Sequence, residues 1–162
     1  MNRYPDEPGE APGAVLDQSA RDHGMTRIAP ARRPAFAIRL AIAATLAGSG
    51  YIHAQLYLDG YRFIHVVGDL FLLQASAAFA VAALVLFAAP VLLRVAAAGV
   101  ALGALAGFTA SRTIGVFGFT ERGLQPAPQA LLSVLLETGT LLVLAAWQAA
   151  ARTRRPVALN DP

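Results

Sequence analysis

Four long apolar segments separated by short polar ones dominate the pattern of this chain. They run over residues 35–58, 64–87, 91–111 and 129–151. A helix needs roughly 20 mostly apolar residues to cross the hydrocarbon core of a bilayer, and each segment is long enough. The pattern therefore predicts an all-α membrane protein, a bundle of four transmembrane helices in a single domain over residues 35–151.

The two ends of the chain lack this pattern. Residues 1–34 combine many prolines with charges of both signs and have no helical or strand periodicity. Such a segment cannot bury enough apolar surface to offset the entropy of ordering it, so we expect a disordered N-terminal tail. Residues 152–162 are expected to form a second, short tail.

Turn-forming residues separate the four segments. Pro34 suits the first turn of the first helix because proline has no amide hydrogen to leave unbonded there. Asp59 and Gly60 predict a tight turn, so the first two helices should form a hairpin. Pro90 marks a second short turn, and residues 112–128 form the longest loop.

The distribution of charges along the chain predicts its orientation in the membrane. Charged residues make up 14% of the chain, against about 25% in an ordinary soluble domain. The net charge is +3, and all 13 basic residues are arginine. Eight arginines flank one set of span ends and three flank the other, and the side richer in arginine stays in the cytoplasm. We therefore predict a multi-pass protein of the cell (plasma) membrane with both termini cytoplasmic, and we expect no nucleic-acid binding.

Several kinds of chemistry are absent from the sequence. The chain has no cysteine, which excludes disulfides, thiolate metal sites, covalent haem attachment and a cysteine nucleophile. No hydrolase triad, phosphate-binding glycine loop or dinucleotide fingerprint occurs. We therefore expect a protein that is not an enzyme, and the sequence assigns no cofactor.

Ionisable side chains within membrane helices cost free energy unless they are paired or hydrated, so each one is a candidate functional residue. They gather toward the predicted outer half of the membrane. Glu137 is the deepest, about 12 Å inside its span at ~1.5 Å of helical rise per residue. The candidate polar cluster comprises His53, His65, Asp69, Arg112 and Glu137.

Two interpretations of this cluster stay open. In the first, Arg112 pairs with Glu137 or Asp69 as a buried clamp, and the histidines form hydrogen bonds near the interface. In the second, His53, His65, Asp69 and Glu137 bind a divalent metal, or the cluster contacts a lipid headgroup, quinone or haem. Because Glu137 is the deepest carboxylate, Glu137→Gln is expected to reduce the folded yield in detergent more than Glu121→Gln; equal yields would show that Glu137 needs no charged partner.

The third segment carries a stripe of small residues at every fourth position. Small residues let neighbouring membrane helices approach closely, so this stripe predicts a packing face. The alternative is that a chain rich in alanine and glycine produces such runs by chance. The stripe consists of Gly99, Gly103, Gly107 and Ser111.

These patterns favour a non-enzymatic accessory or scaffold bundle surrounded by lipid. Its partner through the stripe would be a second copy of the chain or another membrane protein. The alternative is a metal-, haem- or quinone-linked redox accessory protein with its site in the outer half of the membrane.

Four short strings resemble a group of small, uncharacterised four-span integral membrane proteins of high-GC Gram-positive (actinobacterial) bacteria. They are Asp-Gly-Tyr-Arg at 59–62, Gly-Asp-Leu-Phe-Leu-Leu-Gln at 68–74, Gly-Val-Phe-Gly-Phe-Thr-Glu at 115–121, and Pro-Gln-Ala-Leu at 128–131. The resemblance covers about residues 40–150. It implies four helices and a plasma-membrane location, but no activity. The group has a proline after the Tyr-Arg element where this chain has His65, which counts against a metal site common to the group.

Overall fold

The computed structural model describes residues 32–153. The predicted tails fall almost entirely on residues 1–31 and 154–162, which lie outside the described residues. Within the described part, the elements are α2 (Arg32–Asp59), the 3-10 helix η1 (Tyr61–Phe63), α3 (Val67–Phe87), α4 (Val91–Thr113) and α5 (Gln129–Thr153).

The predicted all-α class with four membrane-length helices is confirmed. The apolar part of each long helix extends over 21 to 25 residues and carries few charges. This is long enough and apolar enough to cross a bilayer. The described part of the chain is therefore the helical domain of a multi-pass membrane protein.

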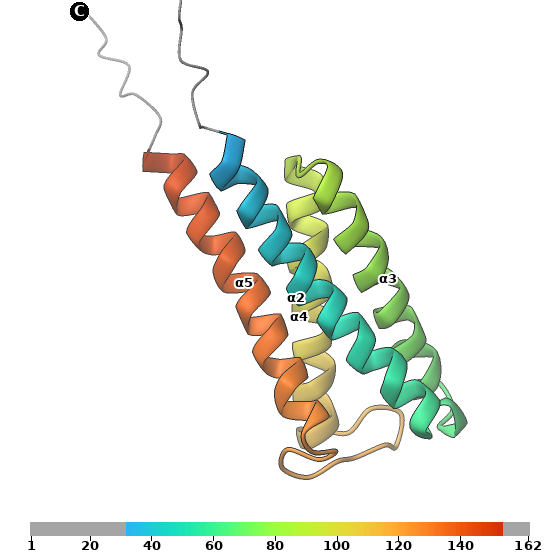
Figure 1. Ribbon diagram of the computed structural model, residues 1–162. Coiled ribbons are helices and arrows are strands. Elements are labelled where there is room, and N and C mark those ends of the chain that lie inside the picture. Colours follow the sequence, from blue (N-terminus) through green and yellow to red (C-terminus); the bar gives the residue numbers. More distant parts are fainter. Residues whose placement is uncertain (1–31, 154–162) are drawn as a thin grey trace, which may run out of the picture. The chain divides into compact units, whose positions relative to one another are not determined.

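The four helices run alternately up and down and form a bundle (Figure 1). α4 packs against α3 on one side and α5 on the other. α2 meets α3 at Gly50, whose missing Cβ would lie 3.2 Å from the Cβ of Ala78, and it meets α5 at Gly48, beside Leu136. The α2–α3 turn and the α4–α5 loop lie at one end, which we call the loop end; the α3–α4 turn lies at the opposite end.

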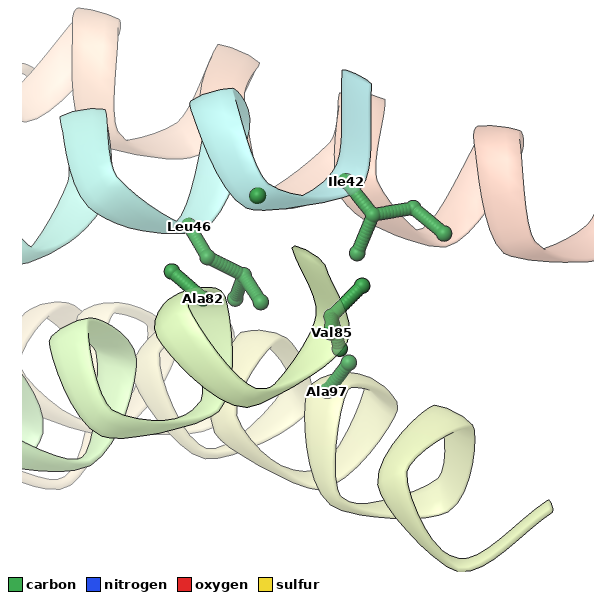
Figure 2. Close-up of a cluster of buried hydrophobic side chains, with 6 residues drawn as sticks. Ile42, Leu46, Ala82, Val85 and Ala97 are labelled. Carbon is green, nitrogen blue, oxygen red and sulfur yellow. The ribbon is translucent and has the colours of Figure 1, made fainter. Parts of the chain in front are cut away.

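The tightly packed core occupies the half of the bundle away from the loop end. Ile42 and Leu46 of α2 contact Ala82 and Val85 of α3, with Ala97 of α4 beside them (Figure 2). Membrane helices associate by close van der Waals contact, and small alanines opposite branched side chains provide it here. This half of the bundle contains none of the five residues of the candidate polar cluster.

Arginines bond the helices together at the opposite end. The Nη1 of Arg39 donates to the main-chain oxygen of Phe87, the last residue of α3, at 3.0 Å. The Nη1 of Arg94 donates to Gln148 of α5 at 2.9 Å, and its guanidinium lies 5.1 Å from the ring centre of Trp147. Arg39 thus places a cation at the last carbonyl of α3, which is favourable, and each of the two arginines joins its own helix to a neighbour.

One predicted boundary is wrong, because α3 begins at Val67 and not at residue 64. After Gly60, which adopts a φ of +144°, the chain makes the short η1 helix, and Val66 then takes a φ of +65°. Gly68 packs directly on this turn, because a Cβ there would lie 2.8 Å from the Tyr61 carbonyl oxygen and 2.9 Å from the Arg62 Cα. The hairpin turn is therefore longer and more closely packed than the Asp59–Gly60 pair predicts.

Candidate functional site

Three segments meet at the loop end through the side chains of Tyr61, Arg112 and Glu121, which we call the loop latch. The Nη2 of Arg112 lies 3.0 Å from the Oε2 of Glu121, and both side chains are only 13% and 15% exposed. The hydroxyl of Tyr61 donates to the other carboxylate oxygen of Glu121. The latch thus joins η1, the end of α4 and the α4–α5 loop.

Arg112 pairs with Glu121, so the predicted clamp of Arg112 with Glu137 or Asp69 is wrong. The loop folds back over the end of α4, where the Glu121 amide donates to the Ser111 carbonyl at 2.9 Å. This brings the Glu121 carboxylate to Arg112.

The other donors of Arg112 are also bonded. Its Nε donates to the Gly123 carbonyl at 2.7 Å, its Nη2 to the Gln125 carbonyl, and its Nη1 to the Ser111 hydroxyl at 2.8 Å. The guanidinium also lies 3.6 Å from the centre of the Phe108 ring. Arg112 therefore holds the loop in place as a whole.

The Tyr61 phenol is enclosed by two aromatic rings. It stacks on Phe71 at 4.6 Å between centroids and meets Phe119 edge-on at 5.7 Å. Burial raises the pKa of Tyr61 above its ordinary value of 10.0, and the hydrogen bond and charge of Glu121 raise it further, while Arg112 opposes them. The phenol therefore stays protonated and keeps donating to Glu121.

Glu137 lies in a polar seam between α2 and α5, built from hydroxyl groups. Its side chain is 2% exposed, and its Oε1 accepts hydrogen bonds from Ser49 at 3.0 Å and from Ser133 at 2.8 Å. One turn further along the seam, the hydroxyl of Thr140 donates to that of Thr45 at 2.7 Å. Within residues 32–153 no cationic side chain forms an ion pair with Glu137.

His53 connects this seam to the interior of the loop end. Its Nδ1 lies 2.9 Å from the main-chain oxygen of Ser49, and its ring lies 5.3 Å from that of Phe71. A carbonyl oxygen only accepts hydrogen bonds, so Nδ1 is the nitrogen that carries a proton. The Nε2 makes no hydrogen bond to any other described residue.

A cavity of about 290 Å³ lies among these groups at the loop end. α2, η1, α3, α4, the α4–α5 loop and α5 all contribute to its lining, which is mostly apolar. Its polar lining residues are His53, Gln74, Ser111, Ser133 and the loop latch. Four other lining residues are also exposed on the outside of the bundle and so mark an opening between α3 and α4: Leu70, Leu73, Gly103 and Gly107.

The five predicted cluster residues do not come together. His53 and Arg112 line the cavity, and Glu137 is linked to His53 through Ser49. His65 and Asp69 are exposed; Asp69 lies in the first turn of α3, where a carboxylate is favourable to the helix dipole. In the described part of the chain, no three histidine or acidic side chains are placed to share a metal ion.

The small-residue stripe of α4 is open along most of its length. Nothing described lies within 4 Å of the place where a Cβ would stand on Gly99, Gly103 or Gly107. Ser111 differs, since it is buried and donates to the Phe108 carbonyl at 2.9 Å. None of the other described helices therefore packs closely on the three glycines.

The sequence pattern missed several residues of this site. Ser133 lies four residues before Glu137, and Ser49 lies four residues before His53, so each pair shares a helix face and could have been found from spacing. Glu121 lies in a loop with no periodicity, and nothing in its sequence surroundings indicates that it meets Tyr61 and Arg112.

Comparison of the chain with known protein families, with curated proteins and with solved structures finds no match.

Proposed function

We propose that this protein is a non-enzymatic accessory protein of the cell membrane, which holds an amphipathic molecule from the outer leaflet in the cavity at its loop end. The observation that carries the proposal is the opening between α3 and α4. Gly103 and Gly107 line the cavity and are exposed on the side of the bundle, where a membrane helix faces lipid.

The size and lining of the cavity support a small occupant. Small-molecule sites are usually mostly apolar cavities of about 300–1,000 Å³ with a few polar groups that fix orientation. The cavity of about 290 Å³ lies at the lower end of this range. Its polar lining residues belong to the loop latch or lie within about two helical turns of the loop end.

The arginine distribution supports the outer leaflet as the source of this molecule. Arg39 and Arg94 lie at the opposite end of the bundle, and that end is the richer in arginine. By the positive-inside rule, the end with Arg39 and Arg94 would face the cytoplasm, and the loop end would face outward.

A second candidate function is lateral association with a transmembrane helix of a second copy or of another membrane protein. It is favoured by Gly99, which is exposed on the stripe but does not line the cavity. A metal- or haem-linked redox role has less support, because the described histidine and acidic side chains do not converge.

The matched variants Gly107→Leu and Gly99→Leu separate these functions. Both glycines have open space where a side chain would start, but Gly107 alone of the two lines the cavity. We expect mass spectrometry of extracts of the purified protein to find an amphipathic molecule retained by the wild type and by Gly99→Leu but lost from Gly107→Leu.

Identical extracts from the wild type and Gly107→Leu would contradict the cavity function. Loss of crosslinking to a partner in Gly99→Leu would instead favour lateral association.

A further inference from the structure

We infer that the cavity recognises a hydroxyl group of its occupant, which donates a hydrogen bond to the Nε2 of His53. The ligand class is an apolar molecule that carries a phenolic or alcoholic hydroxyl. This inference rests on the proposed function, because it names the chemistry that the same cavity selects.

The His53 ring is held in one orientation. Its Nδ1 is held by the Ser49 carbonyl at 2.9 Å, and that carbonyl can only accept. When the ring is neutral, its proton is therefore on Nδ1, and Nε2 presents a lone pair. Among residues 32–153 no side chain donates to it, although His53 lines the cavity.

Four other polar groups that line the cavity already donate hydrogen bonds within the protein. The hydroxyls of Tyr61, Ser111 and Ser133 donate within the protein, and Arg112 directs its nitrogens to the loop and to Ser111. None of these groups can turn to His53 without breaking a bond already made. In the described part of the chain none of these four groups supplies the donor that Nε2 lacks, and a hydroxyl group of the occupant can supply it.

Gln74 adds a complementary group. Its Nε2 donates to the Val100 carbonyl at 3.0 Å, which leaves its second N–H and its carbonyl oxygen without a described partner. Gln74 lies three residues after Phe71 and so shares its face of α3, and the His53 ring lies 5.3 Å from that of Phe71. A hydroxyl both donates and accepts, so it can bond to His53 and Gln74 together. A quinone or ether oxygen only accepts.

The test compares two probes, 4-nonylphenol and 4-nonylanisole, which differ only at the oxygen: it carries a hydrogen in the phenol and a methyl group in the anisole. Binding of each to the purified full chain is measured by isothermal titration in detergent micelles. A net hydrogen bond corresponds to roughly a 10-fold difference in affinity. We expect the phenol to bind about 10-fold more tightly than the anisole.

The variant His53→Phe keeps an aromatic ring beside Phe71 but removes the acceptor, and the exposed His65→Phe is its control. We expect the preference for the phenol to disappear in His53→Phe and to remain in His65→Phe. Nitrogen-15 NMR of the wild-type imidazole provides a measurement that does not depend on the variant folding. Nε2 should be unprotonated in the free protein, and its resonance should shift on addition of the phenol but not of the anisole.

Each outcome distinguishes the two proposals. Equal affinities for the two probes, both abolished by Gly107→Leu, would overturn the hydroxyl inference and leave the cavity function standing. A protonated Nε2, whether or not Nδ1 also carries a proton, would overturn the inference as well. If neither probe shows binding that depends on Gly107, the cavity function itself fails.

Discussion

At the scale of single residues, the two carboxylates that are largely enclosed within residues 32–153 are stabilised in different ways. Glu121 is paired with Arg112 and accepts from Tyr61. Glu137 accepts from two serine hydroxyls and has no described cationic partner. A glutamine carbonyl can accept from hydroxyls just as a carboxylate does, but it cannot replace the charge that balances an arginine.

The first prediction follows from this contrast. We expect Glu121→Gln to lower the thermal unfolding midpoint in detergent more than Glu137→Gln, because it leaves a mostly buried Arg112 without its counter-charge. A hydrogen bond to a charged group contributes about 1.5–3 kcal/mol, so the difference should be readily measured by circular dichroism. This is the opposite of the order that the sequence alone suggests.

The matched variant Asp69→Gln is the control for the loss of one negative charge, since Asp69 is exposed. If Glu137→Gln lowered the thermal unfolding midpoint more than Glu121→Gln, the hydroxyl groups of the seam would require a carboxylate.

The second prediction concerns the pH dependence of the latch. Burial, together with the Glu121 hydrogen bond, raises the pKa of Tyr61 above its ordinary value of 10.0. The folded state thus favours the neutral phenol. Its contribution to stability is complete below pH 10 and is lost as the pH rises through the higher folded value.

Subtracting the phenolate absorbance titration of Tyr61→Phe from that of the wild type isolates this phenol among the 4 tyrosines of the chain. We expect the difference titration to have its midpoint above pH 10. A midpoint at or below 10 would show that the contact with Glu121 is not maintained in solution.

The residues of the site were predictable only where they share a helix with a recognisable neighbour. Glu137 and His53 are prominent because polar groups are costly in apolar segments. The partner of Arg112 was not predictable, because the loop that carries Glu121 returns to α4 through main-chain bonds that no side-chain pattern indicates. The depth of a polar residue in the membrane indicates that it needs a partner, but it does not identify that partner.

At the scale of elements, the sequence predicted the helices well and the turns poorly. Apolar length alone places α4 and α5 within two residues of their observed ends. It fails at the start of α3, because Ile64 and Val66 are apolar and yet belong to a compact turn. Hydropathy cannot distinguish an apolar turn from an apolar helix.

The third prediction tests the packing of that turn. Gly68→Ala places a methyl group within 3 Å of the Tyr61 and Arg62 main chain, whereas Gly99→Ala meets no described atom. Overpacking costs about 1–3 kcal/mol, while replacing an exposed helical glycine gains roughly 0.5–1 kcal/mol. We expect Gly68→Ala to lower the thermal unfolding midpoint and Gly99→Ala to leave it unchanged or raise it.

If the two variants have equal midpoints, the turn must yield to the added methyl group, and the close contact between η1 and α3 would not be needed for stability.

At the scale of the whole molecule, the fourth prediction concerns orientation. The chain has no cysteine, so single cysteines report without background. Ala88 lies between α3 and α4, Thr120 lies in the α4–α5 loop, and both are exposed. We expect a membrane-impermeant maleimide to label Thr120→Cys in intact cells and Ala88→Cys only after permeabilisation, because the arginine-rich end stays inside.

The reverse labelling pattern would invert the orientation and would place the cavity in the inner leaflet.

The two halves of the bundle differ in how closely they are packed. The half around Ile42 and Val85 is closely packed (Figure 2), and the half near the loop contains the cavity. The sequence predicted the polar character of the loop half, since its ionisable residues gather there. It did not predict a cavity, because a void depends on how side chains from several elements meet.

The entrance to the cavity has two unlike edges. On the α4 edge, Gly103 and Gly107 have no rotatable side chain, so no change of rotamer on this edge can narrow the entrance. On the α3 edge, Leu70 and Leu73 can swing about their side-chain bonds on the picosecond-to-nanosecond scale typical of exposed residues. For the proposed occupant, the width of the entrance would therefore depend on the rotamers of these two leucines, while the glycine edge stays constant and no helix has to shift.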